Sequence, residues 1–173
     1  MNSELKEKLA SCELLVMDID GTLTDNSMYY SSDGEYLKRF NVKDGMGITL
    51  LRKAGIKTAF LTSENSKIVE TRSKKLNIDK TILGSRNKTD DIKSICDELN
   101  VDLSKTAFIG DDVNDFHALQ LVGISACPSD AVESIKNVSM IHLNNKGGGG
   151  AVRELSEMIL KASNKPVILQ ENW

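Results

Sequence analysis

The chain has 173 residues, of which 40% are hydrophobic and 27% charged, a composition typical of one globular domain with a hydrophobic core. Its formal net charge of −3, without any basic block, argues against a nucleic-acid partner. No apolar run reaches the roughly 18 residues of a membrane-spanning helix, and the charged N-terminus lacks an apolar signal core, so we expect a cytoplasmic protein.

In chain order, short apolar runs alternate with amphipathic runs. The apolar runs predict strands buried on both faces, over residues 14–18, 57–62, 81–83, 106–109, 124–127 and 140–143. Helical periodicity predicts helices over residues 44–53, 66–76, 88–99, 114–121, 131–137 and 151–162, the first of them capped by Asp44. This alternation indicates an α/β fold, a Rossmann-like three-layer sandwich with a parallel sheet in the middle.

One segment departs from the alternation. Residues 28–30 and 36–40 flank Ser31-Ser32-Asp33-Gly34, a run typical of a hairpin turn, so we expect a projecting β-hairpin over about residues 26–41. We find no internal repeat, long linker or second domain. The sequence therefore predicts one domain over residues 1–165, followed by a C-terminal tail over residues 166–173.

Polar side chains follow four of the predicted strands. Asp18 and Asp20 end the first, two positions apart, so both side chains point the same way. Thr62 ends the second, Lys88 follows the third and its loop, and the run GDDVND at residues 110–115 follows the fourth. Because ligands of parallel α/β sheets bind beyond the carboxyl ends of the strands, we expect these residues to form one site.

Each feature alone has an ordinary explanation: aspartates in a turn, a threonine that caps a helix, a solvated lysine. Together they are more informative, because clustered acidic groups require a cation and hard oxygen ligands suit Mg²⁺. Thr62 and Lys88 add donors for an anion beside that metal. A metal, an anion, a carboxylate nucleophile and a carboxylate acid/base predict phosphoryl transfer through an aspartyl phosphate.

These ordered motifs, DIDGT at residues 18–22, Thr62, Lys88 and GDDVND, resemble those of haloacid dehalogenase-superfamily phosphatases. The resemblance implies a fold of that superfamily and a Mg²⁺ cofactor. It implies that Asp18 is the nucleophile and that Asp20 is the general acid and then the general base. It also implies that Thr62 and Lys88 hold the transferring phosphoryl group.

The same resemblance implies a metal site made by Asp18, the backbone carbonyl of Asp20, and Asp111. Asp112 and Asp115 are expected to support the metal site or to orient Lys88.

The chain is predicted to lack a cap domain, because residues 25–57 hold only a hairpin and one helix. The runs DGEYLKRFNVKDGMGI, IVETRSKKLNI and KGGGGAVREL resemble a capless branch that acts on 3-deoxy-ulosonic acid phosphates in surface-polysaccharide biosynthesis, of lipopolysaccharide or sialic acid. That resemblance implies a homotetramer in which each hairpin helps cover a neighbouring active site. The C-terminal tail either enters a neighbouring site or is a frayed end.

Two positions concern the substrate. Glu64 stands where branch members that act on 3-deoxy-D-manno-octulosonate 8-phosphate usually carry arginine, and Lys75 stands where nonulosonate (KDN or N-acylneuraminate) 9-phosphate phosphatases carry lysine. Both therefore favour a nine-carbon substrate. The ordinary alternatives are that Glu64 favours a helix N-terminus and that Lys75 is solvated. We expect Arg72 and Arg153 to form surface pairs, with contact to substrate or to a neighbouring chain as the alternative.

Two other functions remain open. A non-catalytic module of this fold that assists a CMP-sugar (acylneuraminate cytidylyltransferase) synthetase is one, although such a module can lose its nucleophile or acid and Asp18 and Asp20 are both present. A phosphoacceptor signalling domain is the other, but its nucleophile normally lies in a middle strand, which the early DIDGT motif opposes.

Overall fold

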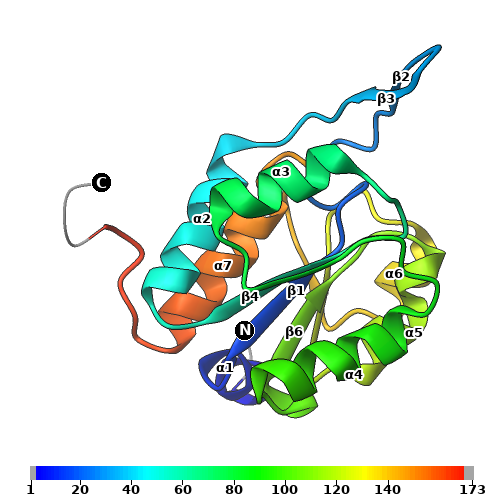
Figure 1. Cartoon of the computed structure of the whole chain (residues 1–173). Coiled ribbons are helices and arrows are strands. Elements are labelled where there is room, and N and C mark those ends of the chain that lie inside the picture. The colour runs from blue at the N-terminus through cyan, green and yellow to red at the C-terminus, as the bar shows by residue number, and fades with distance from the viewer. Residues whose placement is uncertain (1–2, 170–173) are drawn as a thin grey trace.

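A six-stranded parallel sheet with the order β5–β4–β1–β6–β7–β8 forms the middle of the computed structural model, which describes residues 3–169 (Figure 1). Its strands are β1 (Leu14–Met17), β4 (Lys57–Leu61), β5 (Lys80–Ile82), β6 (Thr106–Ile109), β7 (Ile124–Cys127) and β8 (Ile141–His142). The order places β1 between β4 and β6. Three strands that carry predicted site residues at their ends are therefore neighbours.

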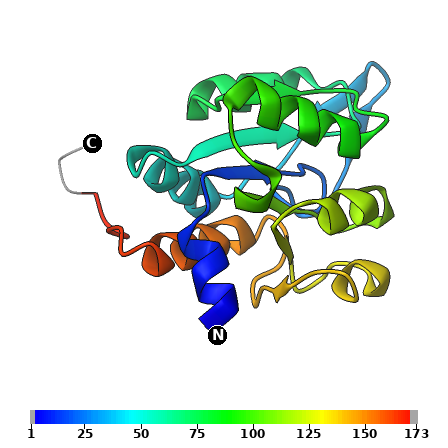
Figure 2. The ribbon, with the colours of Figure 1, turned by 90° about the horizontal axis from the view of Figure 1, so that it is seen from below.

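Helices cover both faces of this sheet (Figures 1 and 2). The first face packs against α1 (Ser3–Ala10), α2 (Val42–Lys53), α3 (Lys67–Leu76) and α7 (Ala151–Ala162). The second packs against α4 (Lys88–Leu99), α5 (Phe116–Leu121) and α6 (Glu133–Lys136). Two short 3₁₀ turns complete the elements, η1 (Leu103–Lys105) and η2 (Val113–Asp115). The predicted three-layer architecture is confirmed.

Side-chain alternation along β1 explains why its sequence is continuously apolar. Leu15 and Met17 join the core on one face of the sheet, whereas Leu14 and Val16 join the core on the other. All four are fully buried, and burying one such side chain stabilises the fold by about 1.5–3 kcal/mol. The three cysteines are free and buried: Cys12, Cys96 and Cys127.

The start of α2 differs from the prediction that Asp44 caps this helix. The helix begins at Val42, and the side chain of Asn41 accepts a hydrogen bond from the backbone N–H of Lys43. Asp44 instead lies buried within the first turn, where it accepts the backbone N–H of Arg153 at 2.8 Å. The helix therefore begins two residues earlier than predicted, and its cap is Asn41 rather than Asp44.

The predicted helix over residues 114–121 is also divided in two. Asp112 and Asp115 form a capping box that tightens residues 113–115 into η2, and α5 begins only at Phe116. The helix α1 was not predicted, and α6 and β8 are shorter than their predicted ranges.

A hairpin of β2 (Tyr29–Ser31) and β3 (Gly34–Leu37) projects away from the sheet (Figure 1). Gly34 has φ +115°, which favours glycine at the turn, and a bridge between Thr24 and Phe40 closes the base. Between β1 and α2, the described chain forms this hairpin and no cap domain. Residues 170–173 of the predicted tail lie outside the described residues. Within residues 3–169, no helix has both the length and the apolar character needed to cross a bilayer.

Candidate active site

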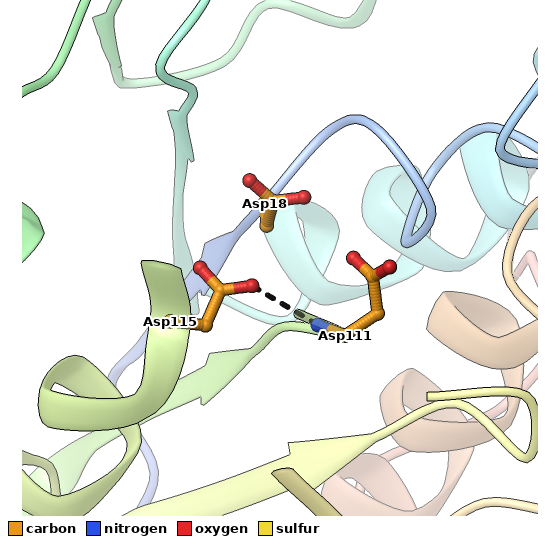
Figure 3. Close-up of side chains that lie close together, drawn as sticks. All are labelled: Asp18, Asp111 and Asp115. Atoms are coloured by element: carbon orange, nitrogen blue, oxygen red, sulfur yellow. Dashed lines mark hydrogen bonds between the residues drawn. The ribbon is translucent and has the colours of Figure 1, made fainter. Parts of the chain in front are cut away.

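Three buried carboxylates converge beyond the carboxyl ends of β1 and β6 (Figure 3). Asp18 follows β1 directly, Asp111 follows β6 after one glycine, and Asp115 ends η2. One oxygen of each lies within 4.8 Å of one oxygen of the others. Because β1 and β6 pair directly in the sheet, residues 93 positions apart in the chain are brought to the same place.

Lys88 is the positive charge of this cluster. Its Nζ lies 2.5 Å from Asp18 Oδ1 and 2.5 Å from Asp115 Oδ1, and its side chain is only 4% exposed. The asparagine Asn87 caps α4 by accepting the N–H of Asp90, and this makes Lys88 the first residue of the helix. A cation is unfavourable at a helix N-terminus, so the two carboxylates must compensate for this position. Burial lowers the pKa of Lys88, but the charges of Asp18 and Asp115 outweigh it and the net pKa is raised.

Asp115 positions its neighbours. Its Oδ1 accepts from Lys88, and its Oδ2 accepts the backbone N–H of Asp111 at 3.0 Å, the contact drawn in Figure 3. Both oxygens of Asp115 are thus already engaged, which leaves Asp18 and Asp111 as the carboxylates better placed to bind a metal. Asp112 lies outside the cluster. Its side chain is exposed and accepts the N–H of Val113 at 2.7 Å.

The cluster carries more negative than positive charge. Burial raises the pKa of Asp18 well above its ordinary value, and the nearby charge of Asp115 raises it further against the opposing effect of Lys88. Burial and Asp115 also raise the pKa of Asp111 to about 7, although Thr22 Oγ1 donates to Asp111 Oδ1 at 3.2 Å. Buried carboxylate oxygens in excess of one ammonium fit a hard divalent cation, which would supply the missing positive charge.

Gly21 allows the chain to turn beside this cluster. It has φ +88°, and a Cβ at this position would lie 2.0 Å from Asp111 Oδ2. The first residue of the glycine run 147–150 packs against the same turn, because a Cβ on Gly147 would lie 1.8 Å from the carbonyl oxygen of Gly21. The site therefore depends on close backbone approach from a distant loop.

Asp20 lies at the edge of the cluster and is half-buried. Its Oδ1 accepts a hydrogen bond from Lys38, a residue of the hairpin segment. Its Oδ2 is buried and has no hydrogen-bond partner among residues 3–169. Asp18 and Asp20 therefore contact different cations, Lys88 and Lys38.

Thr62 follows β4, which pairs with β1 on the side opposite β6. The threonine is buried, and its Oγ1 accepts the backbone N–H of Glu64 at 3.2 Å. Glu64 itself is exposed in the loop that leads to α3. The structure thus places both residues at the carboxyl edge of the sheet that holds Asp18.

Lys75 lies elsewhere. It is exposed in the last turn of α3, nine residues from the cap Ser66, and at 1.5 Å per residue the two are about 13 Å apart along the helix. It lines a groove with Phe40 and Arg72. Within one chain, the structure does not bring Lys75 to Glu64.

The two arginines contact protein groups. The guanidinium of Arg72 lies 5.4 Å from the centroid of the Phe40 ring, a cation–π contact. Arg153 pairs with Glu157 one turn along α7, with 2.8 Å between Nε and Oε1.

Sequence reasoning missed several residues around the site. Lys38, Glu35 and Ser66 form a chain of polar contacts that leads to Asp20, and no sequence signal separates this lysine from a solvated one. Thr22, which bonds Asp111, lies inside the DIDGT motif, and Gly147 begins the glycine run. The motif and the glycine run were the available signals for these two.

The fold and the site together define a class of protein: a parallel α/β enzyme for phosphoryl transfer, with a buried carboxylate and lysine at the edge of the central strands. The family model for haloacid dehalogenase-like hydrolases matches residues 52–155. The chain belongs to this family and is a phosphoric monoester hydrolase, as its motifs predict.

The chain is similar along most of its length to named phosphatases. It is 37% identical over 161 residues to the 3-deoxy-D-manno-octulosonate 8-phosphate phosphatase of Haemophilus influenzae, covering 93% of this chain and 89% of that protein. The cobalt-bound structure of the H. influenzae enzyme has a TM-score of 0.89 at 37% identity, over 91% of this chain and 92% of that one. The Moraxella catarrhalis phosphatase of the same name, in complex with a magnesium ion, a phosphate ion and a KDO molecule, has a TM-score of 0.91 at 36% identity, over 95% and 94%.

Proposed function

We propose that this protein is a Mg²⁺-dependent phosphatase that hydrolyses a 3-deoxy-ulosonic acid phosphate through an aspartyl phosphate on Asp18. The observation that carries the proposal is the buried contact of Asp18 with Lys88, beside Asp111. A carboxylate nucleophile must approach an anionic phosphate, and this requires positive charge held next to it.

The first half-reaction forms the aspartyl phosphate. A carboxylate oxygen of Asp18 attacks phosphorus, and the bond between phosphorus and the sugar oxygen breaks. Asp20 gives its proton to the departing sugar oxygen, while Lys88 and Thr62 hold the transferring phosphoryl group.

The second half-reaction hydrolyses that intermediate. Asp20, now a carboxylate, takes a proton from water as the water oxygen attacks phosphorus. The bond between phosphorus and the Asp18 oxygen breaks, inorganic phosphate leaves, and both aspartates return to their initial states.

Asp18, Asp111 and the backbone carbonyl of Asp20 would hold the Mg²⁺, with Asp115 fixing Asp111 and Lys88 around it. When bound, the ion neutralises charge between the phosphate and the carboxylates. The all-oxygen donor set and the excess negative charge of the cluster support this assignment over a softer metal.

The substrate has two candidates. The names of the relatives favour 3-deoxy-D-manno-octulosonate 8-phosphate. Glu64 favours a nonulosonate 9-phosphate, because an exposed carboxylate beside Thr62 can accept hydrogen bonds from hydroxyl or amide groups of a longer sugar. Lys75 joins that argument only through a neighbouring subunit, since it lies far from Glu64 in its own chain.

We also propose a homotetramer in which the hairpin covers a neighbouring site. Its support is the exposure of large apolar side chains along the hairpin, where a monomer gains nothing from them: Met28, Tyr29, Tyr30, Tyr36 and Leu37. Sedimentation equilibrium tests this directly, and a monomer at micromolar concentration would contradict it.

The test of the reaction is Mg²⁺-dependent phosphate release from a panel of eight- and nine-carbon ulosonic acid phosphates, compared by kcat/KM. The Asp18→Asn variant is expected to lose turnover, and chelation of the metal to abolish it reversibly. Absence of phosphate release from every sugar phosphate would favour the non-catalytic module. A clear preference for the octulosonate would remove the role given to Glu64.

A further inference from the structure

Lys38 is a buried lysine outside the expected catalytic set. It follows β3 in the hairpin segment, and its side chain is only 2% exposed. Its Nζ pairs with Asp20 Oδ1 and lies 2.6 Å from Glu35 Oε1. Lysine is rarely buried unless it is paired, and here the carboxylates of Asp20 and Glu35 compensate the buried charge of Lys38. Because both carboxylates already contact Lys38, it has little capacity to bind a further anion.

The contacts of Lys38 continue to the loop after β4. The second oxygen of Glu35, Oε2, accepts a hydrogen bond from Ser66 Oγ. Ser66 is the N-cap of α3, four residues after Thr62. A continuous chain of polar contacts thus runs from this cap through Glu35 and Lys38 to Asp20.

This chain makes the two oxygens of Asp20 unequal. Lys38 holds Oδ1, whereas Oδ2 is buried and has no hydrogen-bond partner among the described residues. A buried oxygen without a partner is costly, and it is explained if a ligand or substrate group completes its bonding. Lys38 therefore engages one oxygen of Asp20, while the other is the oxygen without a partner within residues 3–169.

We propose that Lys38 is a positioning residue for the reaction. It fixes Asp20 through Oδ1, so that Oδ2 is the oxygen that gives a proton to the leaving sugar oxygen and later takes one from water. This inference rests on the proposed function, in which Asp20 is the general acid and base. The ordinary alternative is that the Lys38 pair only anchors the hairpin.

The matched control is Arg39, the next residue. Its Nη1 lies 2.7 Å from Asp25 Oδ2, so it also joins the hairpin segment to the loop after Asp20, but its side chain is exposed and, among residues 3–169, pairs with Asp25 rather than with a site residue. Lys38→Met and Arg39→Met each remove an ion pair between the hairpin segment and the loop after β1, the first buried and the second exposed. Only the first removes a contact with Asp20.

The experiment follows aryl alcohol and phosphate release after rapid mixing, with an aryl phosphate and with a sugar phosphate. For Lys38→Met we expect a burst of aryl alcohol near one equivalent per site, because an aryl group leaves without a proton and Asp18 is intact. Turnover after the burst should be about 10- to 100-fold slower, since a misplaced base activates water poorly. On the sugar phosphate kcat should fall at least as much, without a burst and with KM within about twofold of wild type.

Two further variants keep the test decisive. Lys38→Arg should recover part of the turnover, because a guanidinium can also bond Asp20, and Glu35→Gln should show the same burst with a smaller loss. These two variants carry the test if Lys38→Met does not fold. Arg39→Met should match wild type in burst and turnover.

Each outcome supports or overturns the inference. Wild-type turnover of Lys38→Met on the sugar phosphate would overturn it. So would an equal loss of burst and steady state, which indicates an anchoring role alone. If the wild-type protein releases no phosphate, or if Asp18→Asn remains active, the proposed function itself has failed. Both of these proteins retain Lys38, so this failure is distinct from a failure of the inference about Lys38.

Discussion

Replacing Lys88 by methionine should destabilise the metal-free protein by about 3–5 kcal/mol, because the change leaves buried carboxylates without their cation. The structure supports the upper part of this range. The Lys88 ammonium lies 2.5 Å from both Asp18 and Asp115, and its side chain is 4% exposed, so water cannot replace it. Methionine fills a similar volume, so little of the loss would come from a cavity.

The assay is urea unfolding of metal-free protein at pH 8, where the carboxylates carry most charge. The matched control is Lys93→Met in the same helix, because Lys93 forms an exposed pair with Asp90 at 3.4 Å and its loss should cost less than about 0.5 kcal/mol. In a chain of this size, a loss of 3–5 kcal/mol corresponds to a fall in Tm of roughly 6–20 °C.

The loss of stability in Lys88→Met should depend on pH and on metal. Without Lys88, the pKa of Asp18 rises further, so the variant should lose less stability at pH 5, where Asp18 takes up a proton. Added Mg²⁺ should restore part of the stability at pH 8. A loss below about 1 kcal/mol at pH 8, or a loss that does not change with pH, would refute the view that Lys88 compensates buried charge.

Three further predictions follow from the same site. Asp20→Asn should slow hydrolysis of sugar phosphates about 10²- to 10⁴-fold and slow the release of aryl alcohol far less; equal losses in a burst experiment would count against Asp20 as the acid. In metal-free protein, the pKa of Asp111 is raised from 3.8 to about 7, so the folded state holds a proton that the unfolded state releases. The free energy of unfolding of the wild-type protein, relative to that of Asp111→Asn, should therefore fall by up to about 4 kcal/mol as pH rises from about 4 through 7. Parallel pH profiles for the two proteins would contradict this. Gly21→Ala should abolish activity, because its Cβ would lie 2.0 Å from Asp111 Oδ2. The control is Gly55→Ala, where φ is +78° and the space is open: this change should lower the free energy of unfolding by about 1 kcal/mol and keep kcat. An active Gly21→Ala enzyme would show that the turn can move.

The fold was largely predictable because the central strands β1, β4 and β6 are short, mostly apolar and followed by polar residues. β1 and β6 are buried on both faces, and this burial requires the continuous apolar runs that identified them. The errors arose at element boundaries. Asp44 was predicted as the cap of α2, but Asn41 caps this helix, and Asp44 lies in its first turn, where it accepts the backbone N–H of Arg153.

The substrate side of the site was less predictable. Glu64 and Lys75 were paired by resemblance, yet they stand near opposite ends of α3 in one chain. A residue pattern cannot state which groups a neighbouring subunit contributes. Comparison of kcat/KM for the eight- and nine-carbon substrates decides between them.

The sequence by itself determined the class of chemistry. The DIDGT and GDDVND motifs place carboxylates directly after two strands, and the carboxyl ends of parallel strands lie on one edge of the sheet. Only the tertiary structure decided how each charge is compensated. It showed that Asp115 holds Lys88 against Asp18, and that Lys38, an unremarkable hairpin lysine in the sequence, is buried against Asp20. Burial and pairing of charges depend on chain segments that are distant in sequence, which no local pattern records.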